Sequence, residues 1–151
     1  MGLREIRAVP RAAVLLAVVL DVRGLAKAVR RITAEPRVES LEIEGVPVDL
    51  VRPGRHGPWP CWVFVTGAHP ERRREPVVQR LAHGLARSGY VCLVPDLPGL
   101  GEGKVGAATL QGAHAVIRAA LERPDVLAGR IALCGASTGA GLAVIAAGHP
   151  E

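Results

Sequence analysis

The chain has 151 residues, of which 49% are hydrophobic, 22% charged and 3% aromatic. This length predicts one domain with a sizeable core, and the composition is that of a globular protein rather than a disordered one. The 18 glycines follow no Gly-X-Y period, which excludes collagen. The longest apolar run, residues 12–20, is too short to cross a bilayer, which takes about 20 residues.

The positive charge is concentrated at one end of the chain. The net charge is +5, and residues 1–31 carry seven basic and two acidic side chains, so residues 32–151 sum to zero. The body of the protein therefore has no basic field for nucleic acid, and we expect no nucleic-acid partner. Cys61, Cys92 and Cys134 stand in apolar runs without metal-ligand spacing, which predicts buried thiols, no metal site and a reducing, cytoplasmic compartment.

Residues 3–31 predict a helix with basic flanks and an apolar middle, interrupted only by Gly24. Three interpretations remain open: a secretory signal, a basic amphipathic anchor that makes weak contact with a membrane surface, or a helix packed on the domain. Asp21 and Arg23 count against a signal, and surface helices most often pack on their own domain. A membrane-associated or exported protein is the alternative to the cytoplasmic location.

From residue 37 onward the pattern predicts alternating strands and helices. Apolar and charged residues alternate over 37–51 around a turn at Gly45, which indicates two half-buried strands in a hairpin. Three uninterrupted apolar runs predict strands buried on both faces of a parallel sheet: Cys61–Val65, Tyr90–Val94 and Ile131–Cys134. Helical spacing follows each run, at 75–88, 109–121 and 138–147. This alternation of strands and helices along the chain predicts an α/β fold over residues 37–151, with a three-layer, doubly wound, mostly parallel sheet.

The most informative motif is G-x-S-x-G, formed by Gly135, Ser137 and Gly139 between a predicted strand and a predicted helix. In a nucleophile elbow a sharp, strained turn points the serine hydroxyl outward, and glycines two positions before and after it avoid clashes. The N–H of Thr138 then points to where an oxyanion would form. This interpretation predicts a positive φ at Ser137.

The same residues fit a second interpretation. Gly135, Gly139 and Gly141 match G-x-x-x-G-x-G, the NAD(P)-binding turn of short-chain dehydrogenases, and a plain glycine-rich turn is a third alternative. A dinucleotide turn opens its domain and needs an acidic residue about 20 positions later. Here the turn follows the other strands, and the sequence ends before that position. The position therefore favours the elbow.

Two further loops follow predicted strands. Gly101, Gly103 and Gly106 match G-x-G-x-x-G, but the helix opens too late, and Val105 follows Lys104 where a phosphate loop needs Ser or Thr. The loop after Val65 could supply a second oxyanion donor. A lone histidine in a loop is more often structural than catalytic, so we expect a structural role for His69.

Taken together, these loops resemble the α/β-hydrolase superfamily over about residues 37–151, in particular its dienelactone-hydrolase-like and small esterase-like members. The similar runs are V-F-V-T-G-A-H-P, G-Y-V-C-L-V-P-D-L-P-G-L-G-E-G and R-I-A-L-C-G-A-S-T-G-A-G. The resemblance implies that Ser137 is the nucleophile, that the N–H groups of Ala68 and Thr138 are the oxyanion donors, that Asp96 is structural, and that no cofactor is used. Thr66 stands where the family usually has histidine.

In this family the catalytic acid and histidine follow the serine in the chain. Only fourteen residues follow Ser137, and His149 would lie more than about 10 Å away along the helix, too far to act as the base. We therefore expect the N-terminal half of a serine hydrolase for small esters or related acyl compounds, inactive by itself. A dehydrogenase fragment and a non-catalytic hydrolase-like module are the alternatives.

Overall fold

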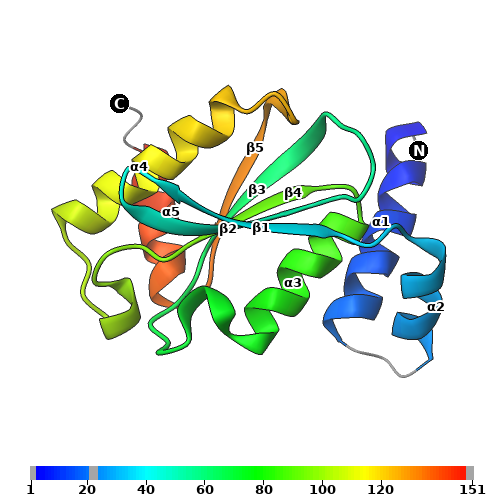
Figure 1. Ribbon diagram of the computed structural model, residues 1–151, viewed down its shortest axis with the longest axis horizontal. Helices are drawn as coiled ribbons and strands as arrows, with labels where there is room; N and C mark the ends of the chain where they lie inside the picture. The colour runs from blue at the N-terminus through cyan, green and yellow to red at the C-terminus, as the bar shows by residue number, and fades with distance from the viewer. Residues whose placement is uncertain (1–2, 21–23, 149–151) are drawn as a thin grey trace.

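The computed structural model describes residues 3–20 and 24–148, which form one mixed sheet with helices on both faces (Figure 1). The sheet has five strands in the order β1-β2-β4-β3-β5. Their bounds are Arg37–Ile43 for β1, Val46–Arg52 for β2, Trp59–Val65 for β3, Val91–Pro95 for β4 and Val126–Gly135 for β5. The helices of the body are α3 at Pro76–Arg87, α4 at Ala107–Glu122 and α5 at Thr138–Gly148, with short 3-10 turns η1 at Arg72–Arg74 and η2 at Leu100–Glu102.

The predicted hairpin is confirmed. Strands β1 and β2 pair antiparallel, and the two residues between them, Glu44 and Gly45, have φ of 48° and 80°. Positive φ at both positions matches the twist of the flanking strands in a two-residue turn. Strand β2 continues antiparallel to β4, while β4, β3 and β5 run parallel, so the carboxyl ends of these three strands meet at one edge.

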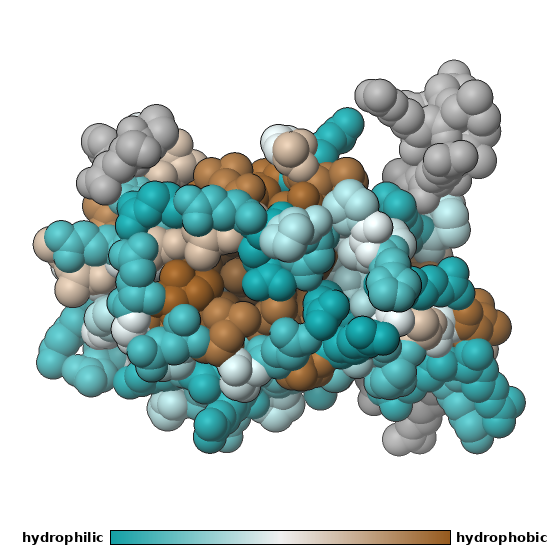
Figure 2. All heavy atoms as spheres, turned by 45° about the horizontal axis from the view of Figure 1, so that its top comes forward, coloured by the Kyte–Doolittle hydropathy of each residue, from teal (hydrophilic) through white to brown (hydrophobic). Residues whose placement is uncertain are grey.

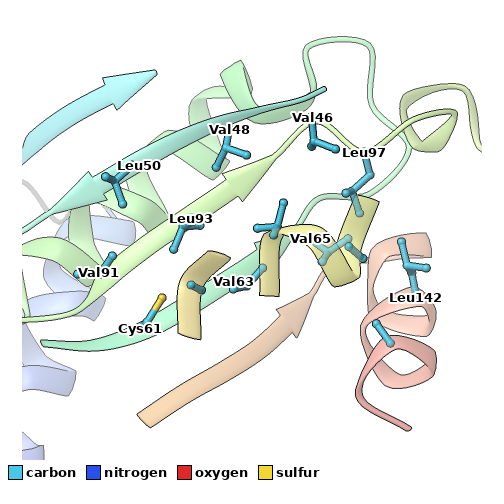
Figure 3. Close-up of a cluster of buried hydrophobic side chains, with 14 of the residues drawn as sticks. Val46, Val48, Leu50, Cys61, Val63, Val65, Val91, Leu93, Leu97 and Leu142 are labelled. Carbon is cyan, nitrogen blue, oxygen red and sulfur yellow. The ribbon is translucent and has the colours of Figure 1, made fainter. Parts of the chain in front are cut away.

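The helices cover the sheet from two sides, which confirms the predicted three-layer α/β architecture. Helix α3 packs on one face, and α4 and α5 pack on the other. On the second face, side chains from β2, β3, β4 and α5 point toward one another (Figure 3). This cluster includes Val48, Leu50, Val63, Leu93 and Leu142, each at most 2% exposed. Burial of such apolar side chains is the main favourable term in folding.

Strand β5 differs from its prediction. The sequence indicates a strand buried on both faces, but residues 127–130 and Ala132 are exposed. The reason is its place in the sheet: among the described residues β5 pairs only with β3, so one edge has no neighbour. The face that Figure 2 turns forward shows apolar side chains gathered around a hollow. A groove of about 330 Å³ lies between α4, β5 and α5, lined by Ile117, Leu121, Ile131 and Leu133 among others.

This open edge leads to a prediction about association. An unpaired strand edge beside exposed apolar side chains, among them Val144 at 73% exposure, favours pairing with other chains. We expect the 151-residue chain to associate in a concentration-dependent way in sedimentation experiments, and Val144→Glu on α5 to weaken that association. The matched control is Leu20→Glu, which changes an equally exposed leucine in the N-terminal region. A monomer over the whole concentration range would contradict the prediction.

The N-terminal segment is two helices rather than the single predicted one. Helix α1 spans Leu3–Val19 and helix α2 spans Leu25–Ile32, and residues 21–23 between them lie outside the described part. Gly24 precedes α2 with φ of 87°, a conformation that a continuous helix does not allow and that glycine adopts without strain. The prediction of one continuous helix was therefore wrong, because the helical conformation is interrupted at Gly24.

Helix α1 packs on α3, as the third of the sequence interpretations expects. Ala17 and Val18 are buried, and a Cβ added at Gly84 of α3 would lie 3.0 Å from Leu15 Cδ1, so the two helices are in close contact. The Ser88 hydroxyl donates to the Arg11 carbonyl over 3.1 Å. Within residues 3–20 and 24–148, every helix falls short of the length and hydropathy that a membrane crossing requires.

The three cysteines are free thiols, and two of them are buried. Burial raises the pKa of the Cys61 thiol to about 12 and also raises that of Cys92, so both stay protonated and unreactive at neutral pH. Cys134 is half-buried on β5.

Candidate active site

The turn from β5 into α5 places Ser137 in a strained backbone conformation. Strand β5 ends at Gly135 and α5 begins at Thr138, so only Ala136 and Ser137 lie between a strand and a helix. Ser137 has φ of 53°, in the left-handed region that non-glycine residues rarely adopt, and its side chain is exposed. The predicted positive φ is thus confirmed, and the hydroxyl lies at the carboxyl-end edge of the parallel strands, where open α/β sheets bind ligands.

Two glycines make this turn sterically possible. A Cβ at Gly135 would lie 2.2 Å from the Gly139 carbonyl oxygen, and a Cβ at Gly139 would lie 2.2 Å from the Thr66 carbonyl oxygen. Both distances are far below van der Waals contact, and the obstacles are backbone atoms that cannot rotate away. In contrast, a Cβ at Gly141 would meet nothing within 4 Å. The elbow therefore needs Gly135 and Gly139, while Gly141 has no steric role here.

The loop after β3 lies directly against this turn. The Ala136 N–H donates to the Val65 carbonyl over 3.1 Å, which ties the start of the elbow to the end of β3. A Cβ at Gly67 would lie 3.1 Å from Ser137 Cβ and 3.7 Å from Ser137 Oγ. Gly67 was not identified from the sequence as a site residue. Its position two residues after a buried strand, where ligand-binding loops begin, could have indicated it. Any larger residue there would crowd Ser137 Cβ and the Ala136 carbonyl oxygen, which would lie 3.2 Å from the added Cβ.

The two expected oxyanion donors, Ala68 and Thr138, are brought together, but in an arrangement that the sequence did not predict. The Ala68 N–H donates to Thr138 Oγ1 over 3.0 Å, although 70 positions separate the two residues. Thr138 is the first residue of α5, so its own N–H has no acceptor within the helix. One expected donor is thus engaged by a side chain, and the other lies at a helix N-terminus.

The remaining residues considered in the sequence take structural positions. His69 Nδ1 accepts a hydrogen bond from the Glu71 N–H over 3.3 Å, within its own loop. In the glycine-rich loop after β4, Gly99 and Gly103 flank η2 with φ of 75° and 73°. Gly101 packs against the Arg72 side chain, since a Cβ there would lie 2.4 Å from Arg72 Nε. His149 lies outside the described residues.

Asp96 forms part of a nearly buried ion-pair network that anchors the loop after β3. The Arg73 guanidinium donates to Asp49 over 3.0 Å through Nε and to Asp96 through a terminal nitrogen, and the Arg73 N–H also donates to Asp96. The three side chains are 12%, 9% and 12% exposed for Arg73, Asp49 and Asp96. The Gln79 amide donates to Asp49 and to the Arg73 carbonyl. The network joins β2, η1, α3 and the residue that follows β4.

Because of this network, Arg73→Met is expected to lower the free energy of unfolding by about 2–3 kcal/mol, since two nearly buried carboxylates lose the charge that compensates them. Chemical denaturation at pH 7 measures the effect. Arg74→Met, at the exposed neighbouring position in η1, is the matched control and should change stability by less than about 0.5 kcal/mol. Equal effects of the two substitutions would contradict the assigned role of Arg73.

Several solved structures that resemble this chain are esterases. The Pyrobaculum calidifontis esterase is 21% identical with a TM-score of 0.63, and the match covers 97% of this chain and 47% of that one. The dienelactone hydrolase from Anabaena variabilis ATCC 29413 is 23% identical with a TM-score of 0.59, over 75% of this chain and 57% of that one. Brefeldin A esterase, a bacterial homologue of human hormone-sensitive lipase, is 21% identical with a TM-score of 0.59, over 90% and 43%. The chain thus spans about half the length of these proteins.

These likenesses establish the α/β-hydrolase fold that the three loops indicated. A comparison with curated proteins finds no match. The family model for X-Pro dipeptidyl-peptidase (S15 family) matches residues 45–151, which include the whole sheet from β2 onward, the loop after β3 and the elbow. The chain therefore belongs to the X-Pro dipeptidyl-peptidase (S15) family.

Proposed function

We propose that this chain supplies the nucleophile and the oxyanion donors of a serine hydrolase that acts on small esters or related acyl compounds. The observation that carries the proposal is the backbone of Ser137, held at φ of 53° in a turn whose flanking glycines cannot accept a side chain. Backbone strain of this kind persists only where the surrounding structure enforces it, and it clusters at functional sites. The exposed hydroxyl beside the loop after β3 fits an attacking group.

The proposed reaction passes through an acyl-enzyme. The Ser137 oxygen attacks the substrate carbonyl carbon while a histidine takes its proton, and the N–H groups of Thr138 and Ala68 stabilise the resulting oxyanion. Collapse of this intermediate breaks the bond to the leaving group, which receives the proton from the histidine. Water then releases the acid by the same steps. In the proposal, the histidine and its orienting acid come from outside these 151 residues.

The names of the relatives agree on the attacked group and differ in the leaving group. The matched family is named after a dipeptidyl-peptidase, which cleaves an amide bond, and the similar solved structures include esterases, which cleave an ester bond. Nucleophilic attack on an acyl carbon is common to both reactions. The dehydrogenase alternative has less support, because a dinucleotide turn uses its third glycine for close packing of helix and strand, and a Cβ at Gly141 would meet nothing within 4 Å. The strained Ser137 backbone also has no purpose in that alternative.

Covalent labelling tests the proposal. The longest natural polypeptide that contains these residues is treated with a fluorophosphonate, and the modified residue is located by peptide mass spectrometry. The chain holds three serines, Ser40, Ser88 and Ser137, and we expect the adduct only on Ser137. Ser137→Ala should abolish labelling and ester turnover, whereas Ser40→Ala, on β1, should retain both. Labelling that survives Ser137→Ala would overturn the proposal. Parallel assays with a p-nitrophenyl ester and an Xaa-Pro p-nitroanilide identify the acyl bond that is cleaved.

A further inference from the structure

One of the two expected oxyanion donors is already engaged by a side chain of the same site. The Ala68 N–H donates to Thr138 Oγ1 over 3.0 Å, and a Cβ at the preceding residue, Gly67, would lie 3.1 Å from Ser137 Cβ. Ala68, Ser137 and Thr138 are all exposed, so substrate can reach this group. We propose that the Thr138 hydroxyl is a built-in occupant of the oxyanion hole, which the developing oxyanion displaces. This inference rests on the proposed function.

The Thr138 hydroxyl and a substrate oxygen compete for the same donor, the Ala68 N–H. A backbone amide has a single proton, so a good hydrogen bond to Thr138 Oγ1 leaves none for a second acceptor. The loop itself does not have to move for an exchange of acceptors. Threonine in a helix populates two χ1 rotamers, so one side-chain rotation withdraws the hydroxyl from Ala68 while Gly67 and the elbow stay in place. The exposed hydroxyl then bonds to water.

The strength of the competing acceptors decides when the exchange happens. The carbonyl oxygen of a bound ester is neutral, like the threonine hydroxyl, so it gains little by taking the Ala68 N–H. An oxyanion is charged, and hydrogen bonds to ionised acceptors are about twice as strong as neutral ones. The Ala68 bond to substrate therefore forms in the transition state and not in the ground state. A bond made only in the transition state leaves KM high, whereas a bond made to the bound ester as well would lower KM.

The test is Thr138→Val, which keeps the β-branched shape and removes only the acceptor. The Ala68 N–H then becomes available to the neutral carbonyl of the bound ester. In the longest natural polypeptide with a p-nitrophenyl ester we expect KM to fall by about two- to tenfold, the factor that one net hydrogen bond supplies, with kcat unchanged. Thr138→Ser is the matched comparison, because it keeps the hydroxyl, and its KM should fall by less than that of Thr138→Val.

A second readout is independent of turnover. Hydrogen exchange of the Ala68 amide, followed by NMR after selective labelling of alanine nitrogen, should be faster in Thr138→Val than in the parent and in Thr138→Ser. Two results would overturn the inference. The first is a lower kcat at unchanged KM in Thr138→Val, which would mean that the hydroxyl holds the loop for catalysis. The second is that neither the kinetic constants nor the hydrogen-exchange rate of the Ala68 amide changes in Thr138→Val. Failure of the proposed function is recognised separately, as parent turnover that does not depend on Ser137.

Discussion

The 151-residue chain by itself is expected to hydrolyse an activated ester about 10⁶-fold more slowly than a natural polypeptide that also carries the catalytic histidine. Removal of either the serine or the histidine of a catalytic triad costs about this factor in kcat, since the proton of the attacking hydroxyl has no acceptor. The measurement is the steady-state rate of p-nitrophenyl ester hydrolysis by both purified proteins under the same conditions.

Ser137→Ala provides the control in both proteins. In the longer polypeptide it should lower kcat by about the same factor of 10⁶, because nucleophile and base act as one unit and their losses do not add. In the 151-residue chain it should change the slow rate very little. A large Ser137-dependent rate from the 151 residues alone would show that the catalytic set is complete within them, and it would refute the assignment of the base to residues outside.

The second large effect is expected at Gly139. Gly139→Ala should lower the free energy of unfolding by about 4 kcal/mol or more, because the new methyl group would lie 2.2 Å from the Thr66 carbonyl oxygen and 2.5 Å from the Val65 carbonyl oxygen. Both atoms belong to the end of β3, so relief requires the separation of α5 from the central sheet. Chemical denaturation followed by circular dichroism measures the change, and loss of soluble folded protein is the extreme outcome.

Gly141→Ala is the matched control within the same helix. It adds the same methyl group two residues further along α5, where nothing lies within 4 Å, and should stabilise the protein by about 0.5–1 kcal/mol through higher helix propensity. Opposite signs at the two glycines are specific to a nucleophile elbow, whereas a dinucleotide turn would use Gly141 as well. A similar, small effect at both positions would contradict the close approach of Gly139 to β3.

The sequence was informative wherever the determining interactions are short in range. The order of apolar runs and helical spacing predicted all five strands and the three helices of the body within a few residues, because strand and helix patterns depend on which face is buried. The positive φ at Ser137 was also predictable, since two glycines in a five-residue motif restrict the turn between a strand and a helix. The predictions were wrong at Gly24, where the helix breaks, and at β5, whose uninterrupted apolar run predicts burial on both faces although Ala132 is exposed.

By itself, therefore, the sequence determined the α/β fold and the strained turn that exposes Ser137 between a strand and a helix. Only the tertiary structure decided what surrounds that serine. The contact of Gly67 with Ser137 and the hydrogen bond from Ala68 to Thr138 join segments 70 residues apart. The anchoring of the loop by Arg73, Asp49 and Asp96 likewise needs β2, β4 and η1 to be side by side. The physical reason is that such contacts depend on the order of strands in the sheet, and no local pattern encodes the distance between two loops.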